Sequence, residues 1–391
     1  MLPQENDLYT PIVSKYFRIF ETYEGDEKKG QLLRYRGDLY NADTAQAYDQ
    51  LAQELRPLYV TPLFRLEGDQ QVIQLMKGVI QPKPTRIWGN IVAFILTVLS
   101  VTFAGAYFFS TGALPSNPSG WLEFMKSGLT FAIPLMTILV FHEFGHYLAG
   151  RYHKTAVTLP FFIPFPLSYF GTMGAFIQLK EPPRNRRILL DIGIAGPLAG
   201  VLVAIPVLIL GLYLSPVARI PSPLPLGQIF EGNSILYLLL KLIIKGQLLP
   251  QPVTYAGLNP ILYWIRYFFT SSPLPAGGLD VIINPIVWAG WAGLLVTSLN
   301  LIPAGQLDGG HIMYVLIGKK SVRLLPFILV ALILLGFAWS GWWLWAALIF
   351  FLGRVHAEPL DQITPLDKKR KALAVLGVIL FILVFIPVPL I

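Results

Sequence analysis

The sequence contains no cysteine and few charged residues. Without cysteine the chain has no disulfide framework, no thiolate zinc site and no cysteine nucleophile. Only 13% of its 391 residues are Asp, Glu, Lys or Arg, whereas a soluble globular protein has about a quarter. Because 54% of the residues are hydrophobic, a purely soluble enzyme and a disordered chain are both disfavoured, and much of the surface is expected to face lipid. Any metal must be held by nitrogen and oxygen.

The net charge of +8 is a marker of membrane topology. Residues 1–86 contain 12 acidic and 11 basic side chains, so the basic surplus lies in the apolar remainder. There it forms short clusters beside hydrophobic runs, at 184–187, 319–323 and 368–371. Such clusters are typical of cytoplasmic loops of membrane proteins. A basic stripe interleaved with aromatic residues for base stacking is not present, so nucleic acid is not an expected partner.

Residues 1–86 are expected to form a soluble cytoplasmic α+β domain. Alternating apolar residues predict strands over 32–40, 60–66 and 71–76, and an amphipathic pattern predicts a helix over 43–56. Together these predict a β-α-β-β module, with a helical lead-in near 12–23. The acidic start is unlike an organellar transit peptide, so a bacterial inner membrane is favoured over a plastid membrane.

The remainder is expected to be a polytopic α-helical membrane protein with about seven to eight transmembrane helices. A crossing needs about 20 apolar residues. Residues 87–323 would form the core and 324–391 the C-terminal transmembrane helices. The number of membrane crossings within 233–280 stays open. The segment 324–353 crosses either once as a single helix or twice as two short helices, and the charge pattern favours two. The expected spans are 87–109, 127–150, 188–214, 284–317 with a break near 300–305, 324–353 and 372–390.

One apolar segment, 157–179, does not read as a helix. Pro160, Pro164 and Pro166 interrupt it, and prolines in a helix interior remove hydrogen bonds and clash with the preceding turn. Basic loops on both sides make a full crossing awkward. A re-entrant loop or short β-hairpin that dips into the membrane is predicted, and such backbone must be buried in protein or line a cavity.

The second expected span contains His142-Glu143-Phe144-Gly145-His146. On a helix the two histidines, four residues apart, lie on one face and can bind one metal. Glu143 lies beside the first of them, where a carboxylate can take a proton from a water on that metal. In a soluble helix this short pattern often arises by chance. Within a membrane span, ionisable side chains are costly and usually functional.

Zinc normally takes three protein ligands in a catalytic site, so a third is needed. The candidates are the other three histidines, His153, His311 and His356, and the few carboxylates of the apolar part, of which Asp191 and Asp308 stand out. Asp308 lies eleven residues before Lys319, about 16 Å along a helix, and His142 lies nine residues before Arg151, about 13 Å. The similar depth favours Asp308, whereas Asp191 is better explained as an interfacial ion-pair partner.

The HEFGH motif followed by Asn300-Leu301-Ile302-Pro303-Ala304-Gly305-Gln306-Leu307-Asp308-Gly309-Gly310 resembles the site-2 protease family of intramembrane zinc metalloproteases. The similarity covers roughly residues 87–320, and the N-terminal module resembles the plant and cyanobacterial branch. The resemblance implies one zinc per chain on His142, His146 and Asp308, with Glu143 as general base. It also implies that Asn300 and Pro303 shape the loop before Asp308.

The stretch 171–176 is similar to the family's membrane-embedded β-hairpin, in which Gly171, Gly174 and Phe176 would support substrate binding by strand pairing. The resemblance thus implies a peptidase that hydrolyses transmembrane or membrane-anchored proteins with zinc-activated water. Its active-site opening would lie on the cytoplasmic side. Two alternatives remain: an inactive scaffold or chaperone of the same fold, and a metal transporter. The substrate's identity, the role of the N-terminal domain, regulation and oligomeric state stay open.

Overall fold

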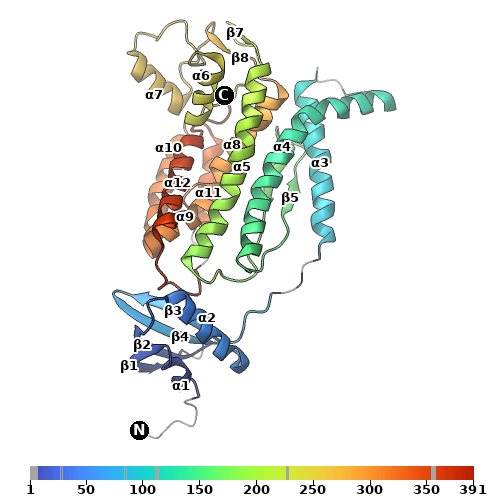
Figure 1. Cartoon of the computed structure of the whole chain (residues 1–391). Helices are drawn as coiled ribbons and strands as arrows, with labels where there is room; N and C mark the ends of the chain where they lie inside the picture. Colours follow the sequence, from blue (N-terminus) through green and yellow to red (C-terminus); the bar gives the residue numbers. More distant parts are fainter. Residues whose placement is uncertain are drawn as a thin grey trace.

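The computed structural model describes residues 8–26, 28, 30–82, 84, 86–110, 114–225, 229–353 and 358–391. A small sheet domain lies at one end of a bundle of long helices, and short helices and strands cover the opposite end (Figure 1). The N-terminus is at the sheet end and the C-terminus is at the other. The chain therefore places its charged domain and its apolar helices in separate layers.

The N-terminal sheet has four antiparallel strands in the order β1-β2-β4-β3. Helix α2 packs on it, and the ring of Tyr48 meets that of Phe64 edge-on at 5.1 Å. The elements are α1 (Thr10–Val13), β1 (Phe17–Glu24), β2 (Gln31–Leu39), α2 (Thr44–Leu55), β3 (Val60–Glu67) and β4 (Gln70–Lys77), with a 3-10 turn at Arg56–Leu58. The helix and three strands expected over 32–76 are confirmed.

The helical lead-in expected near 12–23 is wrong. Only Thr10–Val13 is helical, and Phe17–Glu24 forms the edge strand β1, so the module is β-β-α-β-β. The strand is rich in aromatic and β-branched residues, which favour a pleated surface. Pairing with β2, from Phe17 opposite Leu39 to Glu24 opposite Leu33, decides the outcome. Helical spacing of apolar residues within the segment was misleading, because it does not register pairing with the next strand of the hairpin.

Within the described residues, three helices are long and apolar enough to cross a membrane: α3 (Trp88–Phe109), α4 (Pro118–Tyr152) and α5 (Arg186–Leu214). They confirm the first three expected helical segments. Helix α4 begins nine residues earlier than expected, because Asn117 caps it by accepting a hydrogen bond from the backbone N–H of Gly120. Pro118 follows at the first helical position, where its fixed φ suits a helix start.

Between α4 and α5 the chain forms the antiparallel hairpin of β5 (Phe161–Pro164) and β6 (Thr172–Phe176), which confirms the predicted hairpin geometry. The hairpin packs against α3, where the hydroxyl of Ser100 donates a hydrogen bond of 2.6 Å to the carbonyl of Gly171. Gly171 has φ +72°, and a Cβ there would lie 2.5 Å from the Cα of Val101. Only glycine permits this approach.

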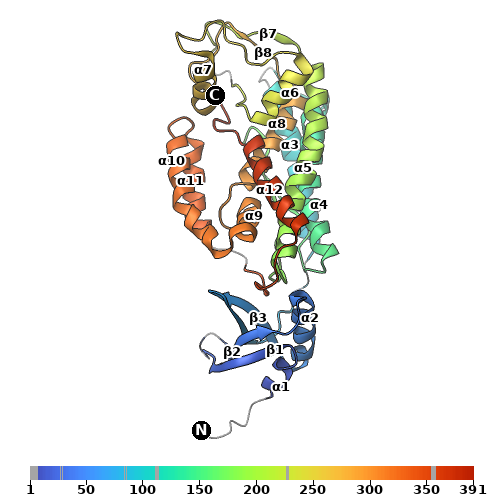
Figure 2. The same cartoon turned by 60° about the vertical axis from the view of Figure 1, so that its left-hand side comes forward.

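The other apolar helices are shorter than a full crossing requires. The segment 284–317 is broken as expected, into α8 (Pro285–Asn300) and α9 (Asp308–Ile317). The segment 324–353 turns back on itself (Figure 2), as predicted. Its helices are α10 (Leu325–Leu335) and α11 (Gly341–Leu352), and the ambiguous region holds α6 (Ile235–Lys245) and α7 (Pro260–Thr270). Helix α12 covers Lys368–Val384, η3 covers Gly318–Leu324, and β7 (Val217–Arg219) pairs with β8 (Leu279–Val281).

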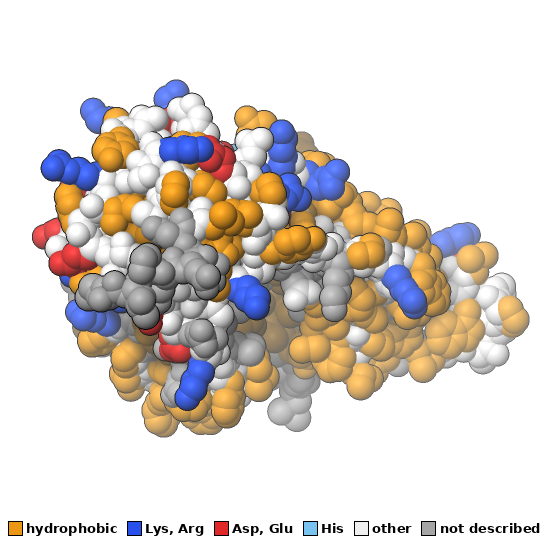
Figure 3. Space-filling model, turned by 90° about the horizontal axis from the view of Figure 1, so that it is seen from below, with side chains coloured by type: hydrophobic (Ala, Val, Ile, Leu, Met, Phe, Trp, Pro, Cys, Tyr) orange, Lys and Arg blue, Asp and Glu red, His pale blue; other side chains and the backbone are white. Residues whose placement is uncertain are grey.

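The segment between α11 and α12 joins the N-terminal sheet to the helices. The N–H of Phe64 in β3 donates to the carbonyl of Leu360, and the N–H of Gln362 donates back to Phe64, each at 3.0 Å. On its other side, the N–H of Asp361 donates to the carbonyl of Arg184 just before α5. The free edge of β3 is thus covered by this segment, at the end of the molecule where Lys and Arg side chains are prominent (Figure 3).

Candidate metal centre

Helix α4 places two histidines on one face. His142 and His146 are both buried, and their Nε2 atoms lie 3.3 Å apart. The Nδ1 atom of His146 lies 2.7 Å from the backbone carbonyl oxygen of Ile192 in α5. Since a carbonyl can only accept, this nitrogen carries the proton and donates. In the neutral ring, Nε2 is therefore left with its lone pair facing His142.

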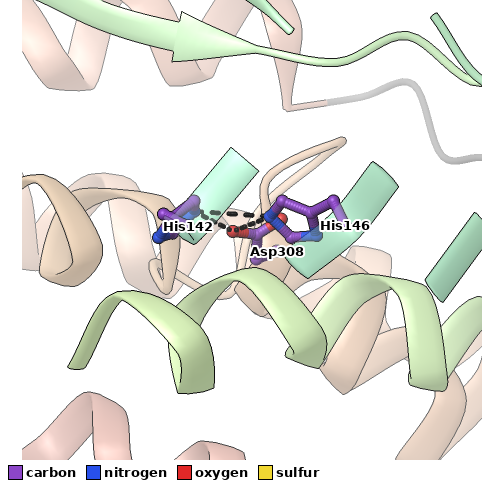
Figure 4. A group of neighbouring side chains, drawn as sticks. All are labelled: His142, His146 and Asp308. Atoms are coloured by element: carbon purple, nitrogen blue, oxygen red, sulfur yellow. Dashed lines mark hydrogen bonds and ion pairs between the residues drawn. The ribbon is translucent and has the colours of Figure 1, made fainter. Parts of the chain in front are cut away.

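Asp308, the first residue of α9, completes the group. Its Oδ2 atom lies 3.4 Å from Nε2 of His142 and 3.3 Å from Nε2 of His146 (Figure 4). The break between α8 and α9 makes this approach possible, because residues 301–307 fold back over the start of α9. A Cβ on Gly309 would lie 1.9 Å from the carbonyl oxygen of Leu301, so the turn requires glycine.

The three donor atoms fit a zinc ion. Zinc with nitrogen ligands at about 2.0–2.1 Å in tetrahedral geometry keeps its ligand atoms about 3.3–3.4 Å apart. The three observed separations are 3.3, 3.3 and 3.4 Å. Oδ2 of Asp308 is buried and, within the described part of the chain, accepts no hydrogen bond. A bound cation would satisfy this oxygen, whose burial without a hydrogen bond is otherwise costly.

Helix α5 supplies the space for both histidine rings. A Cβ on Gly196 would lie 2.0 Å from Nε2 of His146, and one on Gly200 would lie 3.0 Å from Nδ1 of His142. The sequence predicts only close helix packing for this small-residue stretch, so the link to the histidines was missed. The signal that could have found it is the pair of glycines spaced four residues apart, like the histidines opposite them.

Glu143 and two other predicted residues show how the rest of the site is arranged. Glu143 is buried and lines a cavity of about 160 Å³ beside His146 and Asp308. Asn300 lines it as well, with its Nδ2 atom 3.3 Å from Nε2 of His142. Phe176, at the end of β6, forms part of the wall. The chemistry available is thus a two-histidine, one-carboxylate cation site with a second carboxylate next to it.

The remaining predicted residues lie away from this cavity lining. Gly171 and Gly174 shape the hairpin, both with positive φ. Pro303 lies in the break between α8 and α9 and lines a separate cavity of about 40 Å³. The alternative ligand, Asp191, instead binds Arg370 in α12, with Oδ2 2.6 Å from Nη2, and His153, with Oδ2 2.9 Å from Nε2. Gln306, which the sequence did not single out, lines the 160 Å³ cavity.

Comparison with known proteins identifies the family. The sequence model of peptidase family M50 matches residues 130–337. The Arabidopsis thaliana protein named probable zinc metalloprotease EGY1, chloroplastic, is 31% identical over 342 residues, which cover 80% of this chain and 56% of that protein. The rice (Oryza sativa subsp. japonica) protein of the same name is 31% identical over 336 residues, covering 80% and 53%.

Arabidopsis probable zinc metalloprotease EGY2, chloroplastic, is 32% identical over 270 residues, covering 68% of this chain and 43% of that protein. The chain thus spans about half the length of these relatives. No solved structure matches it. Because the family model covers more than half of the chain and includes both histidines and Asp308, the chain belongs to peptidase family M50, the site-2 protease family that its motifs resemble.

Proposed function

We propose that the chain is an intramembrane zinc metallopeptidase that hydrolyses peptide bonds of transmembrane or membrane-anchored proteins. The observation that carries the proposal is the convergence of His142, His146 and Asp308, next to Glu143, on helices embedded in the apolar body. Among the described residues this is the one group of three potential ligands within reach of one ion. A transporter would require further ligand sets along a path, so the peptidase is favoured.

The membrane arrangement follows from charge and helix length. We propose that α8 to α12 and the β5–β6 hairpin lie in the membrane beside α3, α4 and α5. With α8 and α9 counted as one broken span, these helices form seven membrane segments in addition to the hairpin, and eight if the two are counted separately. Helix α4 ends on the side of the N-terminal sheet (Figure 1) and has Arg151 in its last turn. Lys154, which follows the helix, lines a cavity together with Tyr48 and Asp49 of α2. By the positive-inside rule, that end and the N-terminal domain are cytoplasmic. The opening to the active site would be on this side.

The residues of the site have separate tasks. His142, His146 and Asp308 would hold one zinc ion per chain, with Nδ1 of His146 fixed by the Ile192 carbonyl. Zinc held there supplies a Lewis acid that polarises the scissile carbonyl and makes a water acidic. The Glu143 carboxylate accepts the proton of the attacking water and passes it to the leaving amine. Asn300 lies beside His142 and positions it or the substrate carbonyl.

Substrate binding would use the edge of β6. Within the described residues β6 pairs only with β5, so its other edge has backbone groups for an unwound substrate strand. Phe176 connects that edge to the cavity. A helical peptide bond is satisfied internally and shielded, so a substrate that unwinds locally can present its backbone to β6 and its carbonyl to Glu143.

The test compares Glu143→Gln with the native chain in detergent, using a model transmembrane substrate and measuring bound zinc. We expect about one zinc per chain in both proteins and at least about a hundredfold loss of cleavage in the variant, the range for losing a general base. Glu123→Gln on the same helix is the matched control, because Glu123 is exposed, and it should cleave normally. Retained cleavage by Glu143→Gln, or a native chain without zinc or activity, would overturn the proposal.

A further inference from the structure

The cavity beside the metal centre has an apolar wall that the proposed chemistry does not use. Its volume is about 160 Å³. Its lining includes the ionisable and amide groups of the site. It also includes a set of apolar side chains, mostly from two elements, namely Ala175, Phe176, Ile177 and Leu179 from β6 and its continuation, and Leu189 and Ile192 from the first turns of α5.

This wall is held in place by backbone pairing. The segment after β6 bonds to the segment after α4: the N–H of Thr158 donates to the carbonyl of Gln178, and that of Lys180 to the carbonyl of Ala156. Leu179 therefore has a fixed position between two hydrogen bonds. Leu189, which lines the same cavity, is 1% exposed and belongs to the packed core, so its side chain cannot swing away. A rigid wall can discriminate by shape.

We propose that the apolar wall is a side-chain subsite that selects a small or medium aliphatic residue next to the scissile bond of the substrate. The inference rests on the proposed peptidase function and names its substrate preference. A strand paired to the edge of β6 directs successive side chains to opposite faces. One of the residues that flank a scissile bond placed beside Glu143 then points into the space between Leu179 and Leu189.

The volume limits which side chains fit. A cavity of about 150 Å³ lined by Leu, Ile and Phe admits a benzene-sized group, and each water takes a share of about 30 Å³. The 160 Å³ here must also admit the reacting peptide unit and its water. Alanine, valine or leucine can be accommodated, whereas the indole of tryptophan cannot.

Charge adds a second criterion. Glu143 and Asp308 line the same cavity and together balance the charge of the proposed zinc ion, so an acidic substrate side chain would add an uncompensated negative charge. Burial of that charge against the apolar wall is also unfavourable, because among the described residues no Lys or Arg lines this cavity. A substrate with Glu at the subsite position is therefore expected to be poor, as one with Trp is.

The test uses a model transmembrane substrate whose scissile bond has been mapped by mass spectrometry. Ala, Leu, Trp and Glu are placed in turn at each of the two flanking residues, and kcat/KM is measured in detergent. At one flanking position we expect Leu to exceed both Trp and Glu by at least about tenfold, a typical discrimination by a fitted pocket. Leu179→Ala should reduce the Leu-to-Trp ratio at least about threefold, and Leu179→Trp should favour Ala over Leu.

Leu242→Ala on α6 is the matched control, since Leu242 lies on the exposed side of a distant helix; its ratios should equal those of the native chain. Binding of the same peptides to the Glu143→Gln chain, by fluorescence anisotropy, should follow the same order without depending on turnover. Equal cleavage of all four substrates by the native chain would overturn the subsite but leave the peptidase intact. Absence of cleavage with preserved binding order would instead refute the peptidase and support the subsite.

Discussion

The Nδ1 atom of His146 donates a hydrogen bond of 2.7 Å to the backbone carbonyl oxygen of Ile192. This bond joins the helix of the HEFGH motif to α5 and fixes which ring nitrogen faces Asp308. Partners of this kind orient metal ligands and often matter as much as the ligands themselves. Helix α5 is thus part of the metal centre, although none of its residues belongs to the ligand set.

Gly196→Ala should disrupt the centre without changing a ligand. The added Cβ would lie 2.0 Å from Nε2 of His146, so the ring must move away from Asp308. We expect zinc affinity to fall by about 10–100-fold, as for other changes in residues that support metal ligands, measured by competition with a chelator. Gly200→Ala, with 3.0 Å to His142, should have a smaller effect, and the exposed Leu202→Ala none.

Zinc should stabilise the folded chain through Asp308. Free zinc at 100 times its Kd would contribute about 2.7 kcal/mol, seen as a higher Tm after zinc is returned to chelator-treated protein. Asp308→Asn removes the carboxylate that approaches both histidines. Returning zinc to this variant should therefore raise its Tm only slightly. An equal rise in the two proteins would show that zinc binds elsewhere.

Asp191 should stabilise the packing of three helices. It binds Arg370 of α12 through both carboxylate oxygens and His153 at the end of α4. Hydrogen bonds to charged groups contribute about 1.5–3 kcal/mol, so we expect Asp191→Asn to lower the free energy of unfolding by about that amount. A double-mutant cycle with Arg370→Gln measures the coupling. Asp49→Asn, which breaks an exposed pair with Arg184, should cost less than about 1 kcal/mol.

Arg65 should hold the N-terminal domain on the helices. Its Nη1 atom donates to the carbonyls of Pro359 and Leu360 at 3.0 and 2.9 Å. Arg65→Ala should speed hydrogen exchange of the Phe64 and Gln362 amides by at least about tenfold, since about 1.5–3 kcal/mol of charged hydrogen bonding is lost. Arg36→Ala, which breaks a pair with Glu21 on the exposed sheet face, should leave these amides protected.

Tyr16 should make the stability of the N-terminal domain depend on alkaline pH. Its hydroxyl donates to Glu54 at 2.5 Å, and this bond raises the pKa of Tyr16 to about 12. The folded state keeps the proton between about pH 10 and 12, where the unfolded state releases it, so stability falls as pH rises through this window. The native chain should be more stable than Tyr16→Phe below pH 10, and the difference should vanish above 12. Tyr40→Phe, which changes an exposed tyrosine, should track the native chain in denaturant titrations.

Local sequence patterns were sufficient to predict the main helices and the hairpin of this chain. The spacing of His142 and His146 requires only a helix, and Pro303 with its neighbouring glycines interrupts one. The prolines of 157–179 likewise excluded a helix there. These signals act over a few residues, so the three long helices, the break before Asp308 and the hairpin were predicted, and the depth argument pointed to Asp308.

Contacts between distant segments were beyond such patterns. Residues 360–362 pair with Phe64 at the edge of β3 although most of the chain separates them. Even within the β1–β2 hairpin, pairing between strands decided that Phe17–Glu24 is a strand, which the spacing within that segment did not specify. The HEFGH motif and the stretch Leu307-Asp308-Gly309-Gly310 identified the metal-ligand residues from the sequence alone, because residue types and their local spacing can be read there directly. The packing of α5 decided the ring orientation and the space at Gly196 and Gly200. The meeting of α5 with β6 and with the break before α9 decided the shape of the cavity. Only the tertiary structure could set these features, because they depend on which backbones meet in three dimensions.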